Sequence, residues 1–98
     1  MKVGLKNAID MIPDVVDCFD FAVNESCIKY NECEDYAYFL DQNKPVFNVE
    51  YNNNWNDMSM CATGNDLGMD TIVKKTNLKG QMCSCVDSSR DWKCNKVI

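Results

Sequence analysis

The sequence predicts an α/β protein built on a parallel β-sheet. Short apolar runs that suit strands alternate with stretches whose apolar residues recur at helical spacing, in the order strand, helix, strand, helix, strand, helix, strand. Alternation of this kind is typical of parallel βα units. Four strands are half the number in an eight-stranded (β/α)8 barrel, so the chain is predicted to form half of such a barrel.

Each expected element has its own sequence signals. The expected strands cover residues 2–7, 19–24, 45–51 and 71–73, and the expected helices cover residues 9–16, 34–42 and 57–68. Pro13 must interrupt or restart the first helix, because proline has no N–H donor. Asp57 is the expected N-cap of the third helix and Gly68 its C-terminal signal.

The chain is long enough for one domain with a core, because it has 98 residues of which 46% are apolar. Residues 1–86 are expected to form the partial barrel domain. Residues 87–98 are expected to form a loosely held polar tail, because the sequence becomes polar and aperiodic there. A half-barrel leaves unpaired strand edges on both sides, through which two chains could associate.

Charge and composition exclude several classes of function. Fifteen acidic and ten basic residues give a net charge of −5, and the basic residues are scattered, so nucleic acid is not expected as a partner. An acidic surface suits a cationic ligand or polymer, although many ordinary soluble proteins share it. The absence of histidine excludes Ser-His-Asp and Cys-His catalysis and leaves carboxylates for proton transfer. Neither a membrane span nor a signal-peptide pattern follows Met1, so no membrane association is expected.

Seven cysteines in 98 residues are a high density, and the odd number leaves at least one unpaired if the others form disulfides. Three interpretations stay open: disulfides in an oxidising compartment, a thiolate metal site, and reduced structural thiols. Cys83 and Cys85 form a tight pair, but no CxxC motif elsewhere completes a zinc site. The metal site is therefore the least favoured of the three interpretations, and no metal and no cofactor are expected.

Polar residues end the predicted strands, where parallel sheets bind their ligands. Glu25 and Glu50 would end adjacent strands, so their carboxyl groups are expected within several Å of each other. Such proximity raises one pKa and can separate an acid from a base. Trp55, in an Asn-rich loop, is a candidate for stacking against a sugar ring. The alternative is that strands end in polar residues only because loops begin there.

Several runs, in their order and spacing, resemble the C-terminal part of glycoside hydrolase family 114. They are Val3–Asn7, Phe19–Cys27, Tyr30–Cys33, Lys44–Tyr51 and Leu67–Gly68 before Thr71–Ile72. The resemblance implies the C-terminal half of a TIM barrel and an extracellular endo-α-1,4-polygalactosaminidase. Its substrate would be a galactosamine-containing polysaccharide, and it would need no cofactor.

The resemblance also implies roles for individual residues. Glu25 matches a catalytic carboxylate and would be the general acid/base, with Ser26 where the family more usually has Gln. Glu50 would bind substrate or adjust the pKa of Glu25, and Lys6 and Tyr51 would be further cleft residues. Together with the stacking candidate Trp55, they make up the expected substrate-binding residues. The second catalytic acid, an Asp in a Pro-Asp-Asn motif, has no counterpart here. These 98 residues alone are therefore expected to be inactive.

The family pattern further implies disulfides between Cys27 and Cys33 and between Cys61 and Cys83. Two functions remain as alternatives to a hydrolase. One is a remnant that binds polysaccharide without cutting it, and the other is a small disulfide-stapled structural protein unrelated to sugars.

Overall fold

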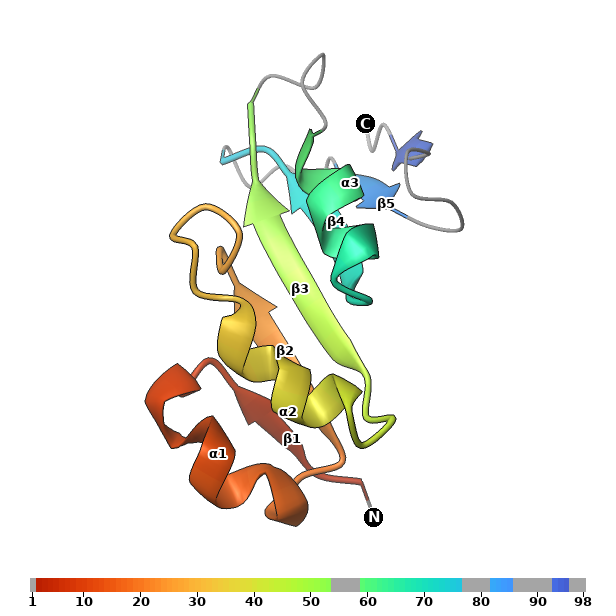
Figure 1. Ribbon diagram of the computed structural model, residues 1–98. Coiled ribbons are helices and arrows are strands. Elements are labelled where there is room, and N and C mark those ends of the chain that lie inside the picture. Colours follow the sequence, from red (N-terminus) through yellow and green to blue (C-terminus); the bar gives the residue numbers. More distant parts are fainter. Residues whose placement is uncertain (1, 54–58, 77–81, 86–92, 96–98) are drawn as a thin grey trace.

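The computed structural model describes residues 2–53, 59–76, 82–85 and 93–95. Within them the strands form one sheet in sequence order (Figure 1), with β1 Gly4–Lys6, β2 Phe21–Glu25, β3 Val46–Tyr51, β4 Asp70–Lys74, β5 Met82–Cys85 and β6 Lys93–Asn95. The pairs from β1 to β4 are parallel, whereas β5 and β6 are antiparallel to their neighbours. The four predicted parallel strands are confirmed.

The helical segments are short and occupy the predicted connections. They are the 3-10 segments η1 Ile9–Met11, η2 Val16–Cys18 and η3 Glu34–Tyr36, and the α-helices α1 Ile12–Val15, α2 Ala37–Leu40 and α3 Ser59–Asp66. Pro13 restarts the first segment as expected, because it lies in the first turn of α1, where its missing N–H is not needed. Gly68 has φ +84° just after α3 and so ends it as predicted. The expected cap at Asp57 lies outside the described residues.

The sheet continues beyond β4, which the sequence did not predict. β5 pairs antiparallel along β4, so β4 is not the unpaired edge expected there. Of the polar tail expected at residues 87–98, residues 93–95 form β6 against β5. The remaining residues of that segment lie outside the described part of the chain.

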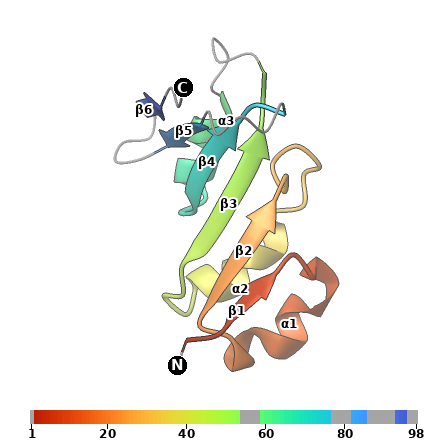
Figure 2. The same ribbon diagram turned by 180° about the vertical axis from the view of Figure 1, so that it is seen from behind.

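The described helices cover one face of the sheet (Figures 1 and 2). Burial alternates along the strands, so every second residue points toward this face. The buried strand positions are Leu5, Ala22, Asn24, Val46, Asn48, Glu50, Thr71, Val73, Cys83 and Cys85. The main core joins β1, β2 and β3 to α1, η3 and α2 through residues such as Ile12, Tyr36 and Phe39. A second, smaller core under α3 contains Cys61, Val73, Cys83 and Cys85.

Two disulfides restrain loops and elements within the described chain. Cys27 and Cys33 are bonded, which confirms the first predicted pairing. The second prediction was wrong, because Cys61 bonds Cys85 and not Cys83. Cys83 and Cys85 lie two residues apart on β5, so both point toward α3 and the sequence does not distinguish them. Cys83 is itself disulfide-bonded. In the backbone register, its position in β5 is paired with position 94 of β6.

No helix in the described ranges is long and apolar enough to cross a lipid bilayer.

Candidate active site

Glu25 is the last residue of β2, on the sheet face opposite the helices. Its strand neighbour Asn24 points to the helix side and is buried, so Glu25 points the other way and is exposed. The next residue, Ser26, has φ +67°, a left-handed conformation that turns the chain sharply out of the strand. This turn leaves the Glu25 carboxylate at the carboxyl end of the parallel sheet.

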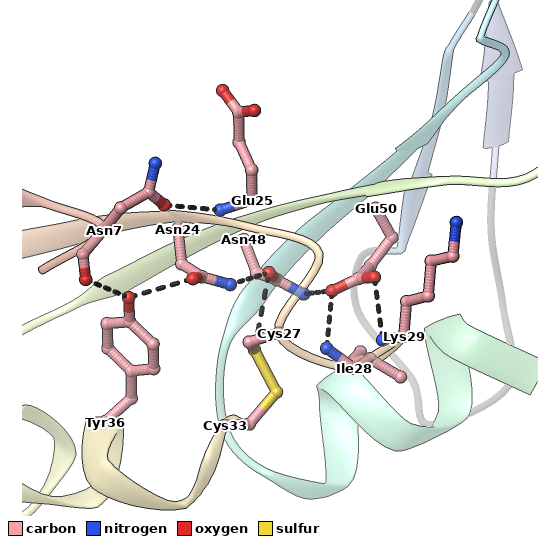
Figure 3. The surroundings of a disulfide bond; sticks show 10 residues. All are labelled: Asn7, Asn24, Glu25, Cys27, Ile28, Lys29, Cys33, Tyr36, Asn48 and Glu50. Atoms are coloured by element: carbon pink, nitrogen blue, oxygen red, sulfur yellow. Dashed lines mark hydrogen bonds between the residues drawn. A yellow bond between two sulfur atoms is a disulfide. The ribbon is translucent and has the colours of Figure 1, made fainter. Parts of the chain in front are cut away.

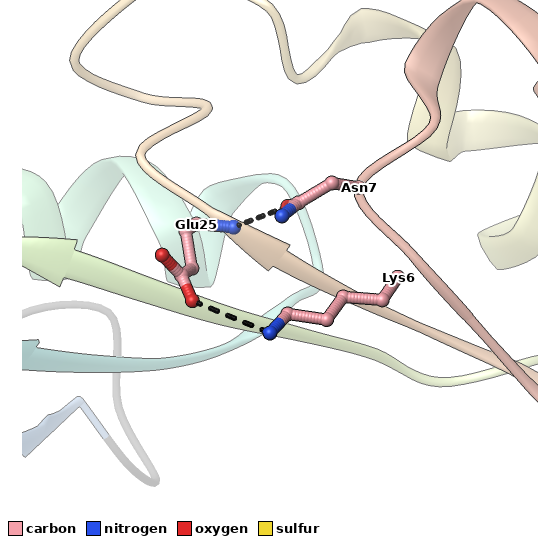
Figure 4. Close-up of polar contacts among 3 residues, drawn as sticks. All are labelled: Lys6, Asn7 and Glu25. Carbon is pink, nitrogen blue, oxygen red and sulfur yellow. Dashed lines mark hydrogen bonds and ion pairs between the residues drawn. The ribbon is translucent and has the colours of Figure 1, made fainter.

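Two residues of β1 and its following turn contact Glu25 (Figure 4). Lys6 Nζ lies 3.8 Å from Glu25 Oε1, and the backbone N–H of Glu25 donates to Asn7 Oδ1 at 3.0 Å. Both charged side chains are well exposed, at 68% for Lys6 and 44% for Glu25, so the ion pair contributes at most about 1 kcal/mol. The backbone contact to Asn7, rather than the ion pair, fixes the end of β2.

Beside Glu25 lies an open hollow of about 770 Å³. It is lined by the turn after β1 with the start of η1, by the end of β2, and by the loop after β2 with the start of η3. The exposed Tyr30 is one of the loop residues that line it. Its acidic lining residues are Asp10, Glu25, Glu32, Glu34 and Asp35, and no lysine or arginine among the described residues lines it. The hollow is therefore strongly anionic and suits a cationic ligand.

On the helix side of the sheet, a chain of hydrogen bonds runs between buried polar residues (Figure 3). Asn48 Nδ2 donates to Glu50 Oε2 at 2.9 Å, and Asn24 Nδ2 donates to Asn48 Oδ1 at 2.8 Å. The hydroxyl of Tyr36 lies 2.9 Å from Asn24 Oδ1 and 3.2 Å from the carbonyl oxygen of Asn7. The network thus ties the ends of β1, β2 and β3 together behind Glu25.

The expected proximity of the Glu25 and Glu50 carboxyl groups was wrong. Glu25 lies opposite Val49 in the register, so Glu50 is one residue farther along β3 and points to the opposite face. Glu50 is fully buried, and its carboxylate accepts hydrogen bonds from the backbone N–H groups of Ile28 and Lys29 at 2.9 and 3.3 Å. Glu50 therefore holds the loop after β2.

The hydroxyl of Tyr36 belongs to this network and has a raised pKa. Burial, and secondarily the negative charge of Glu32, raise the pKa of its hydroxyl to about 12. An unfolded tyrosine ionises near pH 10, so between pH 10 and 12 the unfolded chain binds fewer protons and stability falls. We expect the stability advantage of the native protein over Tyr36→Phe to be constant below about pH 10 and to shrink toward pH 12. Urea unfolding of both proteins across this range measures it, and a constant difference up to pH 12 would contradict the assignment.

Of the other predicted site residues, only some lie close to Glu25. Lys6 lies beside Glu25, as described above. Tyr51 shares the helix-free face with Glu25 but ends β3 beyond the position opposite it, and it does not line the hollow. Trp55 lies outside the described residues. The contributions of Lys6, Glu50, Tyr51 and Trp55 to substrate binding stay predictions.

The amide network was not predicted from the sequence, although the sequence carries a signal for it. Three polar residues occupy strand positions that face the core, where apolar residues are usual. Asn24 follows the buried Ala22 on β2, and Asn48 and Glu50 follow the buried Val46 on β3. Polar residues at core-facing positions predict mutual hydrogen bonds. Within the described ranges, no three Cys, Asp or Glu side chains gather in a metal-binding arrangement.

Comparison with known proteins agrees with the geometry. The model of glycoside-hydrolase family GH114 matches residues 1–90. The chain belongs to family GH114. Among solved structures, this GH114 chain matches a crystal structure of Aspergillus fumigatus Ega3 in complex with galactosamine, with 36% identity and a TM-score of 0.69. The match covers 84% of this chain but 37% of that one, so the GH114 chain described here spans part of a TIM barrel. No curated protein sequence matches it significantly.

Proposed function

We propose that this chain forms the part of a polygalactosaminidase-like glycoside hydrolase that carries the general acid/base, Glu25, and acts on galactosamine-containing polysaccharide. The observation that supports this most is the position of Glu25. It ends a parallel strand on the helix-free face and opens into a hollow, which is where TIM-barrel enzymes carry catalytic groups. Family membership and the galactosamine bound to the solved relative support the substrate class.

The charge of the hollow supports an amino sugar over a neutral one. The amine of a deacetylated galactosamine unit is cationic near neutral pH, and acidic side chains line the hollow beside Glu25. The net charge of −5 also attracts a polycationic polysaccharide at long range, an effect that salt weakens. N-acetylation would remove the cation and with it this part of the attraction.

In the proposed reaction, Glu25 protonates the departing glycosidic oxygen. The retaining and the inverting routes of glycoside hydrolysis both need a second carboxylate across the scissile bond. Glu50 does not supply it, because it is buried on the other face with its oxygens bonded to backbone amides. The 98-residue chain alone is therefore expected to bind the polysaccharide without cleaving it.

A second candidate function is polysaccharide binding without catalysis. The exposed Tyr30 beside the anionic hollow favours it, because an aromatic ring and carboxylates together suit sugar binding with or without chemistry. The Cys27–Cys33 and Cys61–Cys85 bridges are typical of oxidising compartments and support extracellular action in either case.

The test of Glu25 is a chimera in which residues 1–90 replace the matching segment of the Aspergillus relative. Glu25→Gln in this chimera should reduce the release of reducing ends from polygalactosamine about a hundredfold or more, because a positioned general acid contributes at least that much. Glu34→Gln is the matched control, since Glu34 lines the same hollow but is not at a strand end. Circular dichroism confirms that both variants fold.

Cleavage by a folded Glu25→Gln chimera at the native rate would refute the acid/base assignment. Cleavage by the 98-residue chain alone, abolished in its own Glu25→Gln variant, would refute the expectation that a second carboxylate is needed.

A further inference from the structure

The loop after Glu25, residues 26–33, is held in one conformation from several sides (Figure 3). Its ends are joined by the Cys27–Cys33 disulfide. Its middle is bonded to β3 through the Glu50 carboxylate, which accepts from the N–H groups of Ile28 and Lys29. Backbone N–H groups of the loop also donate back to the carbonyl oxygens of Ser26 and Cys27. This loop is therefore ordered before any ligand arrives.

The rigid loop presents Tyr30 to solvent. Tyr30 is 62% exposed and lines the hollow together with Asn31 and Glu32, whereas Tyr36 of η3 is buried in the core. A rigid amphipathic ring on an ordered loop loses little conformational entropy when a ligand covers it. Because Tyr30 and Glu25 line the same hollow, a ligand on the Tyr30 ring would share that hollow with the proposed reacting bond.

Lys29 covers one face of the Tyr30 ring and leaves the other face for a ligand. Lys29 Nζ lies 5.5 Å from the centroid of the Tyr30 ring, which is cation–π distance, and Lys29 does not line the hollow. The cation occupies one face, so a sugar can stack on the other. The same cation repels a protonated amine, so the amine of a stacked hexosamine would point toward the carboxylates of the hollow, such as Glu32.

We infer that Tyr30 forms a hexosamine subsite adjoining Glu25, in which the apolar face of the sugar stacks on the tyrosine ring and the protonated amine faces the acidic side of the hollow. The inference rests on the proposed function and names one of its substrate contacts. Glu50 is a positioning residue for this subsite, because it holds the loop that carries Tyr30.

Binding of galactosamine oligosaccharides to the 98-residue chain, measured by titration calorimetry, tests the subsite. Tyr30→Ala should weaken binding about tenfold, because lost stacking and ring contact are worth about 1.4 kcal/mol. Tyr30→Phe keeps the ring and should stay within about twofold of the native affinity. Tyr38→Ala is the matched control, since Tyr38 is 47% exposed on α2 but does not line the hollow. Fully N-acetylated oligosaccharides should bind more weakly than deacetylated ones.

The outcomes separate the subsite from the wider function. Native affinity in Tyr30→Ala, or equal losses in Tyr30→Ala and Tyr38→Ala, would overturn the subsite and leave the proposed function standing. Tighter binding of the N-acetylated form would overturn the predicted orientation of the amine. No binding to the native chain at millimolar oligosaccharide would overturn both the subsite and the proposed function.

Discussion

Glu50→Ala is expected to lower the free energy of unfolding by about 4 kcal/mol, because it leaves several buried N–H donors without an acceptor and opens a void in the core. The carboxylate accepts from the N–H groups of Ile28 and Lys29 and from the Asn48 amide. Each of these donors loses its acceptor, and the fully buried side chain leaves a void. Urea unfolding gives the change in free energy, and amide exchange at Ile28 and Lys29 should accelerate.

The control for Glu50 is the same substitution at an exposed glutamate. Glu34→Ala should change stability by no more than about 0.5 kcal/mol, as is usual for surface sites. Glu50→Gln keeps the volume but replaces one acceptor oxygen with a donor, so most of the loss should persist if hydrogen bonding causes it. Native stability in Glu50→Gln would show that the carboxylate is not the anchor of the loop.

The double substitution Cys61→Ala with Cys85→Ala is expected to lower stability by about 3–4 kcal/mol, the entropic gain predicted for a cross-link between residues 24 apart. The bridge joins α3 to β5, and half of the second core consists of these two cysteines. Few apolar groups are available there to replace the cross-link. Urea unfolding of the oxidised proteins measures the difference.

Two further cysteine variants serve as comparisons for this loss of stability. Cys18→Ala should be close to neutral, because Cys18 is an exposed, unbonded thiol. Cys27→Ala with Cys33→Ala opens a cross-link between residues only 6 apart and should cost about 2 kcal/mol. A loss at Cys61 and Cys85 no larger than that at Cys18 would contradict a structural role for the bridge.

Much of the fold could be predicted because the local signals agree with it. The parallel strands β1 to β4 end at polar residues, Pro13 lies in a first helical turn, and Gly68 follows α3 with positive φ. β5 was missed because Met82–Cys85 is short and lacks β-branched residues. Its antiparallel pairing with β4 depends on contacts that the sequence pattern does not reveal.

The candidate site was predicted less completely, because register is a tertiary property. Knowing that Glu25 and Glu50 end adjacent strands does not determine which face each side chain takes. The observed register pairs Glu25 with Val49, and this shift of one residue sends Glu50 into the core. Similarly, Cys83 and Cys85 are equivalent by strand alternation, and only the position of α3 selects Cys85.

The described chain has two separate cores, and this division affects which parts of the molecule unfold together. The hollow, Glu25 and the loop of residues 26–33 rest on the main core, whereas the Cys61–Cys85 bridge belongs to the second. Local unfolding often follows such divisions, so each core can act as a cooperative unit with its own opening free energy. Reduction of Cys61–Cys85 would then loosen α3 and β5 while the hollow and the loop of residues 26–33 keep their structure. The α3 end of the chain is the part in which sequence can drift, or be redesigned, without moving the carboxylates of the hollow.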